Sequence, residues 1–322
     1  DITVFFLFQL VVVLVEILLL KLYSRHYFNE FNIQHSGNYQ KEDEGGDLSG
    51  FISHSTSLWV ISIFWVLSSQ LDKLVLSTSI PLEDFGVFSL ALVGANLMLT
   101  LFIPINQILM PRFVKLNSEP DKHSLVRDVL KSLQYYLCFF SVITMGLVIF
   151  GKEVLLIWTS NQELSREAGV YLGYLAIGNF IHGVTNIVFI TAYARDDLNE
   201  YARRYVLHVL VFLPISIYAA IVYGEIGVVV VWVSSSSAFF VHTASVFLSR
   251  FIRASLLMTS LPLALIQIGF TLVAMYSFRS VIDLSSLHPF SVLIYLGALF
   301  ASILGINYVI VRKFNNLIFR YE

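Results

Sequence analysis

The feature that most constrains this chain is a succession of apolar segments, each long enough to cross the hydrocarbon layer of a membrane. A spanning helix needs about 20 apolar residues, and nine such segments follow one another along the 322 residues. They occupy residues 2–20, 57–79, 87–110, 133–150, 168–192, 205–223, 226–249, 257–278 and 289–311. Charged residues make up only 13% of the chain, against about 25% in soluble domains. The sequence therefore predicts an integral membrane protein.

We expect these segments to be helices. Inside a bilayer every backbone N–H and C=O group needs a partner within the protein, so only helices and closed barrels cross it. A barrel strand shows about ten residues of alternating polarity, whereas these runs are longer and continuous. The sequence therefore predicts an all-α polytopic membrane protein with about nine transmembrane helices. Pro104 is expected to kink the third helix, and the short turns after residues 79 and 223 predict antiparallel hairpins.

Lysine and arginine are distributed unevenly between the two sides of the predicted membrane. Sixteen of the twenty basic residues fall in one set of alternate loops, and such residues are enriched on the cytoplasmic side. This set includes the segment 122–131, expected to be a short helix at the membrane surface. We therefore expect a cytoplasmic C-terminus. Residues 2–20 lack the preceding positive charge of a signal peptide, so we expect the chain to be the C-terminal part of a longer protein.

The residue types that catalysis uses are sparse and scattered. The connections on the non-cytoplasmic side are short, the eight histidines show no metal-binding spacing, and Cys138 is the single cysteine. Glycine-rich nucleotide motifs and the nucleophile motif G-x-S-x-G do not occur. We expect no catalytic residues, no metal site and no resident cofactor. A net charge of −2 gives no reason to expect nucleic acid as a partner.

Polar side chains follow one face of the second apolar segment. Ser62, Trp65, Ser69 and Asp72 recur at helical spacing, and Lys73 lies about 100° further round the helix. Charges inside a membrane are costly and usually line a cavity. The alternative is that Lys73 extends to the head groups at the membrane surface, and the sequence leaves both open. A buried cation of this kind suits an anionic head group such as a lipid pyrophosphate.

Two further segments carry amide and imidazole side chains on one face each. The candidate cavity residues are Asn96 and Gln107 in the third segment and Asn179, His182 and Asn186 in the fifth. Polar side chains on three separate helices indicate a hydrated central cavity, and amides suit the hydroxyl groups of sugars. Hydrogen bonding between helices is the simpler alternative, and it stays open at this point.

Two neighbouring stretches of sequence resemble a known transporter family. They are QLDKLVLS at residues 70–77 and LEDFGVFSLA at residues 82–91. Supporting matches are Pro104 with Pro111-Arg112, VLLIW at 154–158, LAIGN at 175–179 and YGEIG at 223–227. In this order and spacing they resemble the C-terminal portion of polysaccharide flippases, O-antigen flippases included. These belong to the multidrug/oligosaccharidyl-lipid/polysaccharide exporter superfamily.

The resemblance implies a particular domain organisation. Members have two six-helix lobes that form a V around a central cavity, and some carry two extra C-terminal helices. Mapped onto this chain, the parts are the last helix of an otherwise missing N-terminal lobe at 1–20, a cytoplasmic linker at 21–50, the six-helix C-terminal lobe at 51–249, and two additional helices with a cytoplasmic tail at 250–322. The match fades beyond about residue 250, and Ala194-Arg195-Asp196 stands where a glycine-containing turn is expected.

The resemblance also implies a function. Such proteins move undecaprenyl-pyrophosphate-linked oligosaccharide from the cytoplasmic to the outer leaflet of the bacterial inner membrane by alternating access, with H⁺ or Na⁺ as candidate coupling ion. Implied partners are membrane lipids, a polysaccharide polymerase and a chain-length regulator. On this interpretation Lys73 and Arg112 contact the pyrophosphate, and the amides and His182 line the sugar path. The alternatives are a drug or small-molecule exporter of the same fold, which would keep an unpaired acid in its cavity, and a membrane glycan polymerase or ligase, which needs a large outer loop.

Overall fold

The computed structural model describes residues 48–251, 254–282 and 289–318, together with positions 15, 18, 19 and 21. The elements are α2 (Leu48–Ser79), α3 (Leu82–Thr100), α4 (Phe102–Ser118), α5 (Lys122–Thr159), α6 (Gln162–Ala194), α7 (Leu198–Phe251), α8 (Ala254–Val281) and α9 (Pro289–Ile318). All of them are helices, and seven helical stretches in the described part are long and apolar enough to span a membrane. The prediction of an all-α polytopic membrane protein is confirmed.

The chain divides into two compact units, Asp1–Phe51 and Ile52–Glu322. Most described residues belong to the second unit. The predicted first span and the linker at 21–50 lie outside the described residues, apart from the four positions already named and the start of α2. Seven of the other eight predicted spans each lie in one described helix or in one half of α7, and the span 87–110 runs over α3 and the first half of α4.

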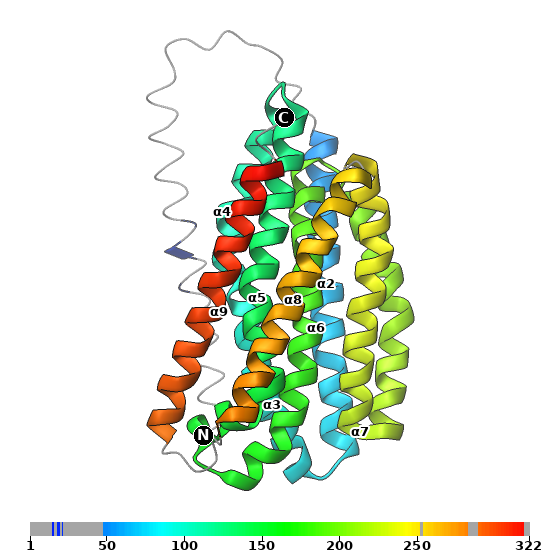
Figure 1. Ribbon diagram of the computed structural model, residues 1–322. Coiled ribbons are helices and arrows are strands. Elements are labelled where there is room, and N and C mark those ends of the chain that lie inside the picture. Colours follow the sequence, from blue (N-terminus) through cyan, green and yellow to red (C-terminus); the bar gives the residue numbers. More distant parts are fainter. Residues whose placement is uncertain are drawn as a thin grey trace. The chain divides into compact units, whose positions relative to one another are not determined.

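The longest element, α7, is a hairpin of two antiparallel halves. It runs for 54 residues and reverses at Gly224, whose φ of 61° and ψ of −142° lie outside the helical region. A side chain disfavours this conformation, which is why glycine occupies the turn. His208 Nε2 lies 2.8 Å from Ser235 Oγ across the two halves, and Figure 1 shows them side by side. The predicted hairpin formed by 205–223 and 226–249 is therefore present.

The boundary between α3 and α4 is an interruption within one membrane-length stretch. Helical hydrogen bonding breaks at Leu101, between Thr100 and Phe102. Pro104 is the reason, because it has no N–H to donate to the carbonyl of Thr100 four residues earlier. The whole stretch Leu82–Ser118 still forms one candidate span of 37 residues. The interruption lies one turn before Pro104, and the backbone angles of Leu101, φ −69° and ψ −18°, stay in the helical region. The kink expected at Pro104 stays a prediction.

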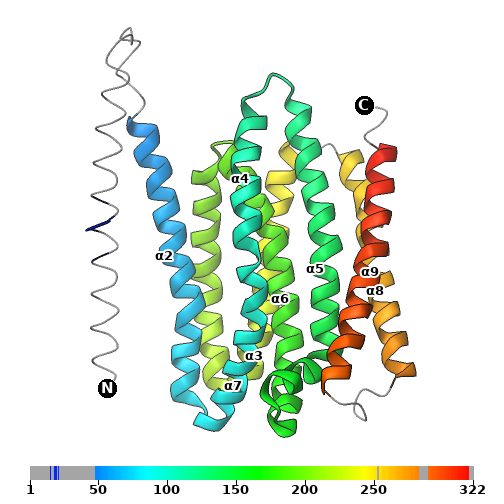
Figure 2. The same cartoon turned by 90° about the vertical axis from the view of Figure 1, so that its left-hand side faces the viewer.

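Helix α6 is the central element of the second unit. It packs against α3, α4, α5 and α7, and Figures 1 and 2 both show it between its neighbours. Glycines allow this close packing, as small residues do in membrane helix interfaces. A side chain at Gly183 would collide with the Tyr136 hydroxyl and the Phe102 ring. The core of the bundle therefore forms around α6, next to the polar residues considered below.

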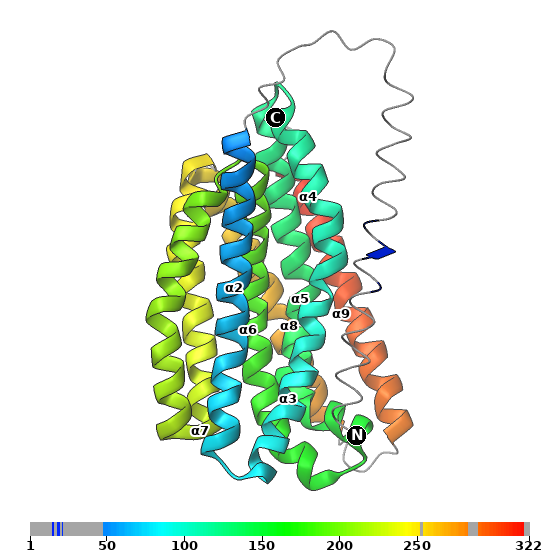
Figure 3. The ribbon, with the colours of Figure 1, turned by 180° about the vertical axis from the view of Figure 1, so that it is seen from behind.

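The last two helices pack on α5. Ring contacts join Phe150 to Phe278 of α8 at 6.2 Å and Tyr135 to Tyr308 of α9 at 6.0 Å. Figure 3 shows α9 beside α5, on the opposite lateral side of the bundle from α7. Helices α8 and α9 therefore add to the α5 side and leave α2, α3, α6 and α7 to form the site.

One local expectation is wrong. The segment 122–131 is not a separate helix, because it forms the first turns of α5, which continues as a regular helix as far as a kink at Phe150 (φ −116°, ψ 19°). Asp121 caps this helix by accepting a hydrogen bond from the His123 N–H at 3.0 Å. The apolar side chains within the segment are largely buried, with Val129 fully covered. Packing of these side chains against the core explains why the helix continues without a break.

Candidate functional site

Four helices enclose a cavity of about 160 Å³, which we call the polar cavity. Its lining residues are Trp65, Ser68, Ser69, Gln70 and Lys73 of α2, Phe88, Leu92, Asn96 and Leu99 of α3, Leu175 and Asn179 of α6, and Val228 and Trp232 of the second half of α7. Three residues of the predicted site, Lys73, Asn96 and Asn179, are therefore brought together here. Each comes from a different helix, as the polar faces in the sequence indicated.

Asn179 is the most constrained side chain at the cavity. It is 2% exposed, and its Nδ2 donates to the Ala95 carbonyl oxygen at 2.8 Å. Its Oδ1 accepts from the indole Nε1 of Trp232 at 3.1 Å. Both ends of the amide are thus occupied by the protein, and the side chain joins α3, α6 and α7. Asn179 therefore holds Trp232 in place.

An aromatic group forms one wall beside the polar cavity. The His182 ring stacks on Trp65 with centroids 4.9 Å apart and planes at 25°. Its centroid lies 6.0 Å from that of Trp232. His182 does not itself belong to the cavity lining described above, although both of its indole neighbours do. The imidazole predicted for the sugar path therefore supports two indoles that reach the cavity.

Lys73 lies at the end of the polar cavity nearer to the turn between α2 and α3. Its side chain is half-buried and belongs to the cavity lining. Asp72 precedes it in α2, and the side chain of Asp72 lies outside the described part. A cation at this place gives the cavity one charged end, while the indoles and amides line the rest.

The chain matches no protein-family model, no curated protein and no solved structure. What the site can do therefore follows from its own geometry. Among the described residues, no group of three or more His, Cys, Asp or Glu side chains is arranged to hold a metal ion. The chemistry on offer is recognition by one ammonium group, neutral amides, hydroxyls and indole rings.

Three predicted site residues lie away from the polar cavity. Asn186 exchanges hydrogen bonds with Asn106, at 2.6 and 3.5 Å, so its amide joins α6 to α4. Gln107 is exposed and lines none of the cavities described. Arg112 is paired with Asp128 through its Nη2 at 2.9 Å. It lines a separate cavity of about 310 Å³ between α4 and α5. The structure does not place Arg112 beside Lys73.

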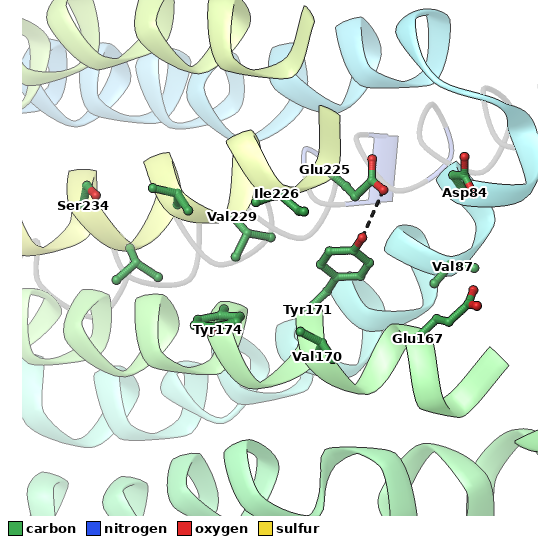
Figure 4. A pocket seen from close by; sticks show the side chains of 12 residues that line it. Asp84, Val87, Glu167, Val170, Tyr171, Tyr174, Glu225, Ile226, Val229 and Ser234 are labelled. Carbon is green, nitrogen blue, oxygen red and sulfur yellow. Dashed lines mark hydrogen bonds between the residues drawn. The ribbon is translucent and has the colours of Figure 1, made fainter. Parts of the chain in front are cut away.

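A larger opening of about 670 Å³ lies along α6 and the second half of α7, and we call it the acidic-ended groove. Figure 4 shows Asp84, Glu167 and Glu225 at one end, Tyr171, Val229 and Tyr174 along it, and Ser234 at the other end. The Tyr171 hydroxyl donates to Glu225 Oε1 at 3.0 Å. Glu167 lies 3.8 Å from Arg166. The groove walls are mainly apolar side chains.

Sequence reasoning missed Trp232 and the acidic-ended groove. Trp232 stands alone among valines and serines, so no polar pattern marks it. The sequence did contain a signal for the acidic end of the groove. Asp84 and Glu225 each follow a helix-breaking residue, Pro81 or Gly224, within three positions, which places both acids at the same end of the bundle.

Proposed function

We propose that this protein is a flippase for lipid-linked oligosaccharides. It moves undecaprenyl-pyrophosphate-linked oligosaccharide from the cytoplasmic to the outer leaflet of the bacterial inner membrane by alternating access. The observation that carries the proposal is the polar cavity, in which one cation and several neutral polar and aromatic groups gather between membrane-spanning helices. The cytoplasmic C-terminus, the coupling ion and the partner polymerase are parts of the same proposal.

The composition of the polar cavity favours this substrate class. A charged side chain in the membrane is expensive and is usually retained for a function. Lys73 offers a positive charge that suits a pyrophosphate, whereas Asn96 and Ser69 offer hydrogen-bonding groups without net charge. A substrate with a compact anionic group followed by many hydroxyls matches both ends of the cavity. A purely apolar lipid matches neither.

Alternating access requires the polar cavity to change size. A volume of about 160 Å³ equals that of about five water molecules, which is much smaller than an oligosaccharide. Helical hydrogen bonding is interrupted at two places next to the cavity lining. These are Leu101, between α3 and α4, and the turn at Gly224. Hinges in proteins lie at a few element-terminal positions of this kind. We propose that the cavity opens around them when the substrate enters.

The decisive test replaces the cation. In a strain that depends on this protein for surface polysaccharide, Lys73→Ala is expected to lower surface polysaccharide at least roughly thirtyfold, as loss of a buried charge contact of about 2 kcal/mol would. Lys115→Ala, at an exposed position of α4, is the matched control and keeps the wild-type level. Protein amounts in the membrane are compared by immunoblot. Wild-type polysaccharide in the Lys73→Ala strain would contradict the assignment of Lys73.

A second candidate function is export of small organic cations. One observation favours it, namely the acidic-ended groove with Asp84, Glu167 and Glu225 beside Tyr171 and Tyr174, because carboxylates and aromatic rings both attract cations. Ethidium efflux from cells separates the two functions. The flippase proposal expects Glu225→Gln to leave surface polysaccharide intact and no efflux to be gained by expressing the protein. Efflux that depends on Glu225 would favour the exporter.

A further inference from the structure

Two of the four tryptophans lie at the polar cavity, and they differ from the other two. Trp59 and Trp158 are 66% and 54% exposed, as is usual for tryptophans near a membrane surface. Trp65 and Trp232 are half-buried and line the polar cavity. They come from α2 and from the second half of α7, and both contact the same imidazole, His182. The fold has therefore brought two indoles together at one cavity wall.

The orientation of Trp232 is fixed by Asn179 and Gly178 of α6. A buried indole N–H needs an acceptor, and the Oδ1 of Asn179 supplies it at 3.1 Å. Asn179 is itself anchored on the Ala95 carbonyl. Gly178 leaves room for the ring, because a side chain there would collide with the indole of Trp232. The ring is thus held in place before any ligand arrives, and such preorganisation lowers the cost of binding.

The polar cavity has a charged group at one end and aromatic rings at the other. Lys73 and Trp65 are eight residues apart on α2, which corresponds to about 12 Å along the helix. A ligand that contacts both must present an anion at one end and a surface that packs on indoles at the other. A pyranose ring has such a surface, because its C–H groups form an apolar face while its hydroxyls point outward. Asn96 lies in the same lining and can bond to those hydroxyls.

We infer that Trp65 and Trp232 form a sugar-binding subsite in the polar cavity, and that Asn179 and Gly178 act as positioning residues for Trp232. The subsite takes a sugar ring close to the pyrophosphate, with the phosphates towards Lys73 and the ring towards the indoles. This inference rests on the proposed function. It adds an orientation of the head group and assigns its recognition to the two indoles, while Asn179 acts through Trp232.

Binding of two probes tests the subsite. Farnesyl pyrophosphate and its glucosylated form are titrated against the purified protein in detergent, and dissociation constants are measured by microscale thermophoresis. The wild-type protein is expected to bind the glucosylated probe roughly two- to tenfold more tightly, the range that aromatic packing supplies. Trp232→Ala is expected to abolish this preference and to leave the affinity for the bare pyrophosphate unchanged. Trp158→Ala is the control and keeps the preference.

Further variants separate the subsite from a folding defect. Trp65→Ala removes the other indole without touching the Asn179 hydrogen bonds, and it is also expected to abolish the preference. Asn179→Asp keeps an oxygen acceptor for the Trp232 N–H, so it is expected to retain more of the preference than Asn179→Leu. The tryptophan emission spectrum, recorded with Trp59, Trp65 and Trp158 replaced by phenylalanine, is expected to shift in Asn179→Leu and much less in Asn179→Asp.

Each outcome has a distinct meaning. Equal affinity of the wild-type protein for the two probes, or a preference that survives both Trp232→Ala and Trp65→Ala, would overturn the subsite and leave the flippase proposal standing. Binding of neither probe to the wild-type protein would overturn the proposed function, and the subsite with it. Loss of both probes in Lys73→Ala, with the preference intact in Trp158→Ala, is the result expected if both are correct.

Discussion

The polar cavity and the acidic-ended groove share the same three helices, yet they offer opposite environments. Adjacent residues of the same helix line the two openings. Phe88, Leu175, Val228 and Trp232 line the cavity, whereas Val87, Tyr174, Val229 and Val233 line the groove. A step of one residue turns about 100° round a helix, so each helix carries both surfaces. The cavity side contains a buried amide hydrogen-bonded to an indole, whereas exposed valines such as Val170 and Val230 line the groove side. Hydrogen-bonded polar groups and exposed apolar walls should therefore respond very differently to mutation.

The largest effect is expected at Gly178, on the cavity side. Gly178→Ala places a methyl group where the Trp232 indole lies, and overpacking of this kind costs about 1–3 kcal/mol. We expect a lower free energy of unfolding and loss of the sugar preference together. Unfolding in detergent, followed by tryptophan fluorescence, measures the first. Val230→Ala in the groove wall, at a side chain 58% exposed, is the control and should change stability by less than about 0.5 kcal/mol.

Asn179→Leu is expected to have the next largest effect. The substitution leaves the Trp232 N–H and the Ala95 carbonyl without their partner. Trp232 is half-buried, so water can satisfy part of this loss, and we expect a total cost of about 1–2 kcal/mol. The melting temperature in detergent should fall clearly below that of the wild-type protein. An unchanged melting temperature would mean that water replaces the amide. The Asn179 hydrogen bonds would then stabilise the cavity side no more than the groove side is stabilised.

Tyr171→Phe removes one hydrogen bond from the groove side. The Tyr171 hydroxyl donates to Glu225, and both side chains are half-buried, so water can satisfy the remaining carboxylate. We expect a loss of about 0.5–1.5 kcal/mol, smaller than for Asn179→Leu. The same unfolding measurement compares the two variants. A larger loss for Tyr171→Phe would reverse the ranking of the two regions.

The smallest effect is expected for Glu167→Gln. The carboxylate is 49% exposed and lies 3.8 Å from Arg166, which is also exposed. Surface ion pairs of this kind contribute about 0–1 kcal/mol. We expect no measurable change in melting temperature, either at low ionic strength or in about 0.5 M salt, a concentration at which the Debye length is well below 10 Å. A salt-dependent loss would show that the acidic end of the groove is more enclosed than its exposure indicates.

The sequence allowed the helical spans to be predicted, because each is a continuous apolar run with its own length constraint. It also placed Trp65 and Lys73 on the same apolar helix, with Trp65 on its polar face and Lys73 about 100° round from it. The sequence could not predict which residues of α6 and α7 line the cavity and which line the groove. Valine and leucine at adjacent positions are equally apolar, so their order does not indicate the surface that each one faces. The partner of Asn186 depends on how far α4 and α6 slide past each other, which apolar periodicity does not determine.

Arg112 illustrates a contact that could have been predicted. Helices α4 and α5 form a hairpin about the turn at Glu119–Asp121, and Arg112 and Asp128 stand nearly equidistant from it. Opposite charges at matching positions of a hairpin are expected to pair. Applied to the sequence alone, that rule pairs Arg112 with Asp128 and so separates it from Lys73.

The hydrogen bonds of Asn179 divide the walls of the polar cavity into two kinds. They fasten α3, α6 and α7 into one block. Helix α2 is less buried, and its hydrogen bonds to the rest of the bundle include those in its first turns, at Ser53, His54 and Ser57. Only 6% of its apolar window is buried, against 61% for α6, and Figure 3 shows it on one face of the bundle. The two residues of α2 that we propose as ligand contacts, Lys73 and Trp65, therefore belong to the least buried of the helices that line the polar cavity.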